Sequence, residues 1–179
     1  MKAVIISIVV AIMLALIFSL PALAQESSTI TITMTGVNEI SISLDKTEWP
    51  LGNVASNTEY ETIPPIEWCT LNVEGNCNVD TFIVGEDAKW VVDGAYKWTL
   101  SNDGSNGEHV YGLWFRISGD TARDYVPITK TEGEFWPYGV GSGLSPGETK
   151  QFGLRLLTPT YFVGGREMQT HITISAVVA

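Results

Sequence analysis

This 179-residue sequence has few of the residues on which enzyme active sites are built. It contains two histidines, His109 and His171, and each lies in a stretch predicted to be a β-strand. It lacks a His-Glu-x-x-His zinc motif and a glycine-rich phosphate loop. Its twenty acidic residues would bring some carboxylates together in any fold, so they do not indicate glycoside hydrolysis. We therefore predict a protein that is not an enzyme.

Basic residues are also scarce. Ten lysines and arginines accompany twenty aspartates and glutamates, which gives a formal net charge of −10. Nucleic acid and anionic lipid headgroups repel such a surface, so we expect neither as a partner. The same charge suits solubility outside a cell or the binding of cations.

The one long apolar run stands at the N-terminus. Lys2 precedes an eighteen-residue apolar run at 3–20, and Pro21 interrupts it. The following Ala-Leu-Ala at 22–24 has the small-x-small form that signal peptidase cuts. We predict a signal peptide over residues 1–24 and a secreted mature chain, extracellular or on the cell surface, that meets the membrane only before cleavage. The alternative is an uncleaved anchor, because eighteen apolar residues nearly span a bilayer.

Short stretches of alternating apolar and polar residues recur along the rest of the chain, without a helical period of useful length. Turn residues separate them, as in the Ser-Pro-Gly-Glu sequence at 145–148. The expected strands lie at 28–35, 40–44, 66–73, 79–84, 96–101, 109–118, 125–129, 151–157 and 169–177. We predict an all-β fold, an Ig-like or jelly-roll-like antiparallel sandwich of about seven to nine strands. One domain over 37–179 would follow an N-terminal strand segment at 25–36.

Cys69 and Cys77 are the only cysteines. In an exported protein, an even pair is most simply a disulfide. The Asn-Val-Glu-Gly-Asn sequence at 72–76 is typical of a turn, so we expect the cysteines to face each other across a β-hairpin. A redox pair needs the closer Cys-x-x-Cys spacing, which seven intervening residues do not give.

The stretch Ser101–His109 gathers side chains that carry oxygen. Asn102, Asp103 and Glu108 are of the kind that Ca²⁺ prefers as ligands. Their spacing is not that of an EF-hand, and the same residues are common in plain turns. Calcium is the only cofactor that this sequence suggests.

A second group of candidate residues is aromatic. Phe135, Trp136 and Tyr138 cluster in a stretch rich in glycine and proline, Glu132–Gly143. Exposed aromatic rings can stack on sugar faces, so a monomeric secreted surface or carbohydrate-binding module is one functional hypothesis. The alternative is a loop that folds over one end of the sandwich.

Four stretches, in this order, resemble a group of exported archaeal and bacterial Ig-like proteins. They are ISISLDKTEWPLGNVASNTEY, LNVEGNCNVDTFIVGEDAKW, WTLSNDGSNGEHVYGLWF and LSPGETKQFGLRLLTPTYFVGGREMQTHITISA. The group is similar to the TasA and camelysin biofilm-fibre family and to archaeal bundling pilins. In the fibre-forming members, an N-terminal strand of one subunit completes the sandwich of the next. The resemblance implies that role for Ser28–Thr35, with Ile30, Ile32 and Met34 as its inward side chains.

The resemblance implies a structural subunit of an extracellular filament, either a pilus or a biofilm-matrix fibre. Its main partner would be another copy of itself, beside other matrix or surface components. Burying the three apolar side chains of the strand would contribute about 5 to 9 kcal/mol. Six ladder hydrogen bonds would add about 1 kcal/mol each, whereas ordering eight residues costs roughly 8 to 16 kcal/mol.

These contributions nearly balance, so docking requires an acceptor groove that already lacks one strand. The alternative is a strand that turns back at Gly36 and pairs within its own chain.

Overall fold

Two long strands form the centre of the larger sheet. β7 (Val110–Ile117) and β10 (Thr149–Leu157) pair antiparallel, with Leu154 opposite Phe115. Along β7 the buried Leu113 and Phe115 alternate with less buried residues, as the sequence pattern predicts. The computed structural model describes residues 31–137 and 143–179, so the predicted signal peptide lies outside the described residues.

Twelve strands make up the described fold. Besides β7 and β10 they are β1 (Ile42–Leu44), β2 (Glu59–Glu61), β3 (Cys69–Val73), β4 (Val79–Gly85), β5 (Ala88–Trp90), β6 (Lys97–Leu100), β8 (Val126–Pro127), β9 (Gly133–Glu134), β11 (Met168–Gln169) and β12 (Ile172–Val178). The described residues contain no helix, and hence none long and apolar enough to cross a membrane.

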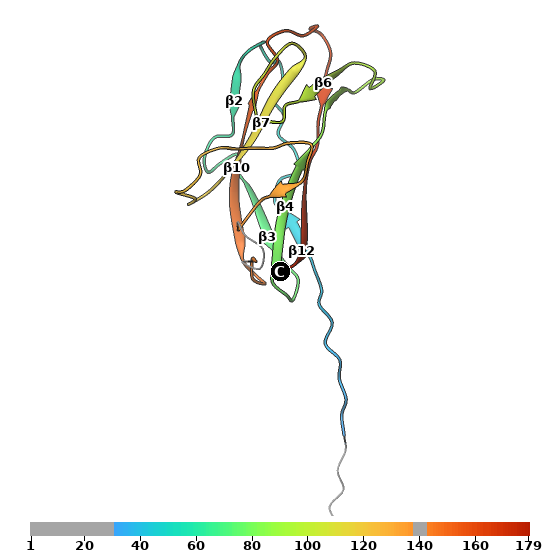
Figure 1. Cartoon of the computed structure of the whole chain (residues 1–179), viewed down its shortest axis with the longest axis vertical. Coiled ribbons are helices and arrows are strands. Elements are labelled where there is room, and N and C mark those ends of the chain that lie inside the picture. The colour runs from blue at the N-terminus through green and yellow to red at the C-terminus, as the bar shows by residue number, and fades with distance from the viewer. Residues whose placement is uncertain (1–30, 138–142) are drawn as a thin grey trace, which may run out of the picture. The chain divides into compact units, whose positions relative to one another are not determined.

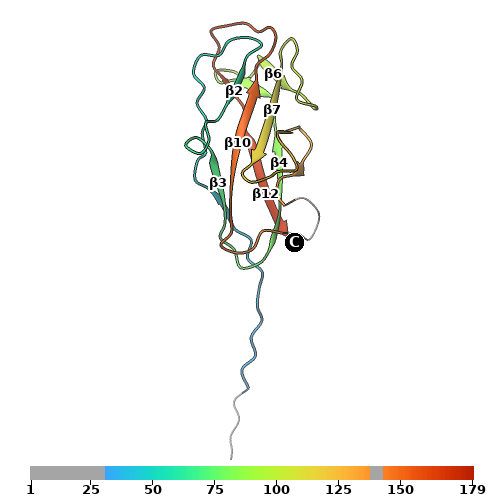
Figure 2. The same ribbon diagram turned by 90° about the vertical axis from the view of Figure 1, so that its left-hand side faces the viewer.

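The strands form two sheets (Figures 1 and 2). The larger has the order β1-β3-β10-β7-β6-β5-β11, with β2 beside β10 and β8 beside β7. The smaller has three antiparallel strands in the order β12-β4-β9. In Figure 1, β10 lies to the left of β4 and β12.

The two sheets share one hydrophobic core. Val79 and Ile83 of the small sheet belong to the same buried cluster as Leu71, Phe115 and other residues of the large sheet. Phe135, directly after β9, packs in this core against Phe115 and Phe152, with ring-centroid distances of 5.2 and 5.0 Å. All described members of the core and of its margin follow residue 37, in the compact unit Val37–Ala179.

The predicted all-β fold is confirmed. All eight strands expected between 40 and 177 overlap an observed one, and the observed count is higher because six of the twelve have only two or three residues. β6 and β7 differ from the expected pattern, since they pair parallel, with Leu100 opposite Tyr111.

The predicted disulfide is wrong, because β3 and β4 do not form a hairpin. They belong to different sheets, and Cys69 and Cys77 are both free thiols. Cys69 pairs with Phe152 at the start of β3, four strand residues or about 13 Å from Val73. Cys77 follows the far end of that strand, where its sulfur lies 3.5 Å from the Glu39 carbonyl oxygen. A disulfide needs Cα atoms within about 7 Å.

A polar junction joins the sheets where the chain passes from β4 to β5. The hydroxyl of the buried Tyr111 donates to the Glu86 carbonyl oxygen at 2.6 Å. The Asp87 carboxylate accepts a 2.9 Å hydrogen bond from the Leu100 amide and lies 3.2 Å from the Lys130 ammonium. These contacts fix the end of the small sheet at which β12 begins, since Ile172 pairs with the adjacent Gly85.

Candidate functional site at the open edge of strand β12

β12 is the outermost strand of the small sheet. It pairs with β4 over its whole length, from Ile172 opposite Gly85 to Val178 opposite Val79, and no other described strand pairs with it. Because Val79 and Ile83 are buried, their partners in β12 point to the core as well. Those inward side chains are only partly covered: Ile174 is half-buried, and Val178 is 45% exposed.

Every second residue of β12 directs its backbone amide and carbonyl away from β4, where no described strand pairs with them. The Ala179 amide donates to the Asn78 carbonyl oxygen at 3.0 Å in the same register as the strand. In an antiparallel ladder, hydrogen-bonded pairs alternate. The amides and carbonyls of Thr173, Ser175 and Val177 thus point to β4. Those of the inward-facing residues point away from it, and we call that side the open edge, formed by Ile172, Ile174, Ala176 and Val178.

The large sheet ends on the same side of the molecule. The cavity described below is lined by residues of both β8 and β9, which places these two strands together. β1 and β12 stand at the opposite ends of their sheets. Ile42 and Leu44 of β1 are also half-buried and pack on the same core as Ile174. Both sheets therefore end here in an edge strand with incompletely covered apolar side chains.

The predicted donor strand is unpaired in its described part. Residues 31–36 form no strand, and Ile32 and Met34 are 73% and 85% exposed. Ile30 lies outside the described residues. Whether these three side chains enter another subunit stays a prediction.

The chain is fastened to the sandwich directly after this segment. The Asn76 side chain donates to the Val37 carbonyl oxygen at 3.0 Å and accepts from the Glu39 amide at 2.7 Å. The backbone amide of Asn76 donates in turn to the Glu39 carbonyl oxygen. Gly36 is thus the one residue between the predicted strand, which ends at Thr35, and this attachment.

Of the described residues in the aromatic stretch, Phe135 lies in the core and Trp136 at its margin. Phe135 is fully buried between Phe115 and Phe152, so its ring offers no face to a sugar. Trp136 is half-buried, with the Lys150 ammonium 5.0 Å from its ring centroid. Tyr138 lies outside the described residues. The expectation that Phe135 contacts a ligand is wrong, because it is needed to fill the core after β9.

The predicted calcium ligands lie in a self-contained turn. One oxygen of Asp103 accepts from the Ser105 hydroxyl at 2.6 Å, the Ser101 hydroxyl at 2.7 Å and the Ser105 amide at 2.9 Å. The Ser105 hydroxyl, followed by that of Ser101, lowers the pKa of Asp103 to about 2. Glu108 instead lies 3.8 Å from the His109 ring. Within 31–137 and 143–179, no three His, Cys, Asp or Glu side chains form a group that could hold a metal ion.

Calcium binding by Asn102, Asp103 and Glu108 stays a prediction from the sequence.

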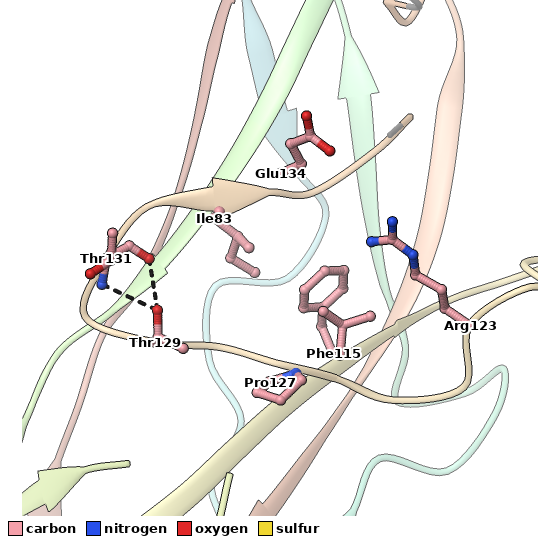
Figure 3. Close-up of a pocket in the computed structure, with 9 residues that line it drawn as sticks. Ile83, Phe115, Arg123, Pro127, Thr129, Thr131 and Glu134 are labelled. Carbon is pink, nitrogen blue, oxygen red and sulfur yellow. Dashed lines mark hydrogen bonds between the residues drawn. The ribbon is translucent and has the colours of Figure 1, made fainter. Parts of the chain in front are cut away.

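A cavity of about 180 Å³ opens between β8 and β9 (Figure 3). Ile83, Phe115 and Pro127 form its apolar wall, and the Thr131 amide donates to the Thr129 hydroxyl at its rim. Pockets for ligands of drug size have volumes of about 300 to 1,000 Å³. This one has room for a single small group, so it is a weaker candidate than the open edge.

No protein-family model and no curated protein sequence matches this chain. The similarity to TasA-like fibre proteins therefore stays a resemblance of quoted stretches.

β12 could be predicted from the sequence as a strand but not as an edge strand. The alternation in Thr-His-Ile-Thr-Ile-Ser at 170–175 predicts which side chains turn inward. It carries no information on how many neighbours the strand has, because pairing depends on segments distant in sequence.

Proposed function

We propose that this protein is a secreted structural subunit of an extracellular filament. Residues Ser28–Thr35 of one subunit add as a strand to the open edge of β12 in the next. The observation that carries the proposal is the open edge itself, a seven-residue strand with an unpaired ladder side and half-buried inward side chains. Exposed strand edges are templates for pairing with another chain.

The dimensions of donor and acceptor agree. β12 has seven residues, about 23 Å at the usual strand rise, and the eight-residue donor spans about 26 Å. Pairing gives partners to the amides and carbonyls of the open edge. The apolar side chains of the donor would cover Ile174 and Leu44, which solvent still reaches in the single chain.

The exposure of the donor segment supports the same proposal. A soluble chain gains nothing from Ile32 and Met34 in water, and apolar side chains at alternate positions of an unpaired segment are typical of a strand that docks elsewhere. The competing carbohydrate-binding hypothesis loses one of its three aromatic residues, because Phe135 is buried.

Electron microscopy of the mature chain, residues 25–179, tests the proposal beside a chain that starts at Val37. The shorter chain retains every described core residue, so circular dichroism should show that it is folded. We expect filaments from the first chain and monomers from the second, with or without calcium. Filaments from the shorter chain, or a mature chain that stays monomeric throughout, would contradict strand donation.

A matched pair of substitutions distinguishes an ordered donor strand from nonspecific apolar association. Ile32→Asp places a charge on the inward face of the donor, whereas Thr33→Asp places it on the opposite face. We expect the first to abolish filaments and the second to retain them. Equal loss in both variants would argue against an ordered donor strand.

A further inference from the structure

The pairing register defines two ends of the sandwich. β1 begins opposite the end of β3, and β4 begins where β12 ends, opposite Val178. We call this the lower end. β4 ends where β12 begins, and Tyr111 at the start of β7 bonds to Glu86 just beyond β4, which defines the apical end. The N-terminal segment joins the sandwich at the lower end, since Val37 is held there by Asn76.

The short connection restricts where a donating subunit can lie. One residue, Gly36, separates the donor strand from the lower end of its own sandwich, and one residue spans about 3.5 Å. The lower end of the donating subunit must therefore lie against one end of the acceptor. It is the end at which the donated strand finishes with Thr35. Strand donation thus implies a direct contact between two sandwich ends.

Strand direction determines which two ends meet. If the donor runs parallel to β12, Thr35 emerges at the lower end of the acceptor, and two lower ends face each other. That arrangement allows each subunit to donate to the other, which closes a two-fold dimer. If the donor runs antiparallel to β12, Thr35 emerges at the apical end. The contact is then head to tail and repeats without closing.

Two features favour the antiparallel direction. β12, β4 and β9 all pair antiparallel, and an antiparallel addition continues this sheet with the slightly more stable ladder. The apical end also carries exposed apolar side chains that a closed dimer would leave in water. Val91 and Val92 are 46% and 72% exposed, and Tyr161 and Val163 are 57% and 44% exposed. We call these four residues the apical patch.

The apical patch is held together by polar contacts. The Arg166 guanidinium lies 4.2 Å from the Tyr96 ring centroid and 5.0 Å from that of Trp90, which precedes Val91. The Tyr96 hydroxyl accepts from the Val163 amide at 2.9 Å. The Val91 amide donates to the Glu167 carbonyl oxygen. A fixed apolar surface of this kind is typical of an interaction site.

The lower end offers a matching surface. Val37 and Ile40 are 76% and 43% exposed, and Val177 and Val178 are 47% and 45% exposed. Contact between the ends would remove both groups from water, since each is apolar and lies where the short connection places it.

We propose, on the basis of the proposed function, that the donated strand runs antiparallel to β12 and that the apical patch of the acceptor packs against the lower end of the donating subunit. The inward faces then match with Met34 opposite Ile172 and Ile32 opposite Ile174. In this register Thr35 lies opposite His171 in a pair without ladder hydrogen bonds, where Cα atoms are about 4.5 Å apart.

Engineered disulfides test the strand direction in the mature chain with Cys69→Ala and Cys77→Ser. We expect Thr35→Cys to cross-link between subunits with His171→Cys, whose Cα separation suits a disulfide, and not with Val177→Cys. Cross-linking through Val177→Cys into closed dimers would overturn the inference while leaving strand donation intact. If neither pair cross-links and no filaments form, the proposed function fails as well.

Charged substitutions test the end contact. We expect Val92→Asp with Tyr161→Ser to weaken subunit association about tenfold, seen as shorter filaments at equal concentration. The disulfide between Thr35→Cys and His171→Cys should still form. The matched control is Ile66→Asp with Ile63→Ser, whose side chains are 77% and 59% exposed away from both ends. Equal filament lengths in the two double variants would overturn the role of the apical patch.

Discussion

The small sheet is closed on one side and open on the other. β9 has only two residues, yet the core beside it is sealed, since Ile128 and Phe135 are 1% and 0% exposed. β12 has seven residues, yet Ile172 and Ile174 on its inward face stay partly exposed. Strand length does not decide whether a sandwich edge is closed. The side chains that cover the edge decide it.

The difference explains why one sandwich can be stable alone and still accept another strand. The closed side has ring contacts between Phe115, Phe135 and Phe152 that need no partner. The open side keeps its apolar residues at the margin of that core, where added cover gains free energy but its absence is tolerated.

The largest effect on stability is expected from truncating a buried side chain on the closed side. Phe135→Ala removes a fully buried ring and should cost about 3 to 5 kcal/mol in the free energy of unfolding. Ile174→Ala on the open side removes a half-buried side chain and should cost about 1 to 2 kcal/mol. Urea denaturation of the Val37–Ala179 chain measures both values. Equal costs would mean that the two edges are equally covered.

A smaller effect on stability is expected when the donor segment binds the open edge as a separate peptide. A synthetic peptide of residues 25–36 should stabilise the Val37–Ala179 chain by about 2.7 kcal/mol at one hundred times its dissociation constant. Differential scanning calorimetry at several peptide concentrations measures this gain. A peptide with Ile32→Asp is the control and should give no shift. Stabilisation that persists in a Phe135→Ala variant but disappears in Ile174→Asp would place the peptide on the open side.

The long central strands could be predicted from the sequence. Alternation in residues such as Leu113 and Phe115 indicates both the strand and its buried face. The short strands β2, β5 and β9 were missed because two or three residues do not establish a period. The burial of Phe135 could not be predicted for a related reason, since a glycine- and proline-rich context does not reveal that the chain returns to the core there.

The cysteines and the open edge depend on pairing between distant segments. The turn residues at 72–76 do form a loop, but that loop connects two sheets instead of two neighbouring strands. Local sequence signals specify a turn and leave the partner of each strand undetermined. The edge position of β12 follows likewise from which segments pair with β4.

The smallest effect on stability is expected from removing the negative charge of Asp87, at the junction between the two sheets near the apical end. Burial raises the pKa of Asp87, but the hydrogen bond from the Leu100 amide and the ammonium groups of Lys130 and Lys97 outweigh it and hold the pKa below the usual 3.8. A depressed carboxyl pKa stabilises the fold above the unfolded value, and this contribution is lost as pH falls through the folded value.

Asp87→Asn should therefore cost about 1 kcal/mol at pH 7, because the amide still accepts from Leu100 but no longer attracts Lys130. The difference from the unchanged chain should shrink below a pH of about 4. Thermal unfolding from pH 7 to pH 2.5 measures it. Asp93→Asn is the matched control, since Asp93 is an exposed turn residue whose carboxylate accepts a hydrogen bond from the Ala95 amide. A constant difference over the whole pH range would show that the Asp87 charge does not hold the two sheets together at this junction.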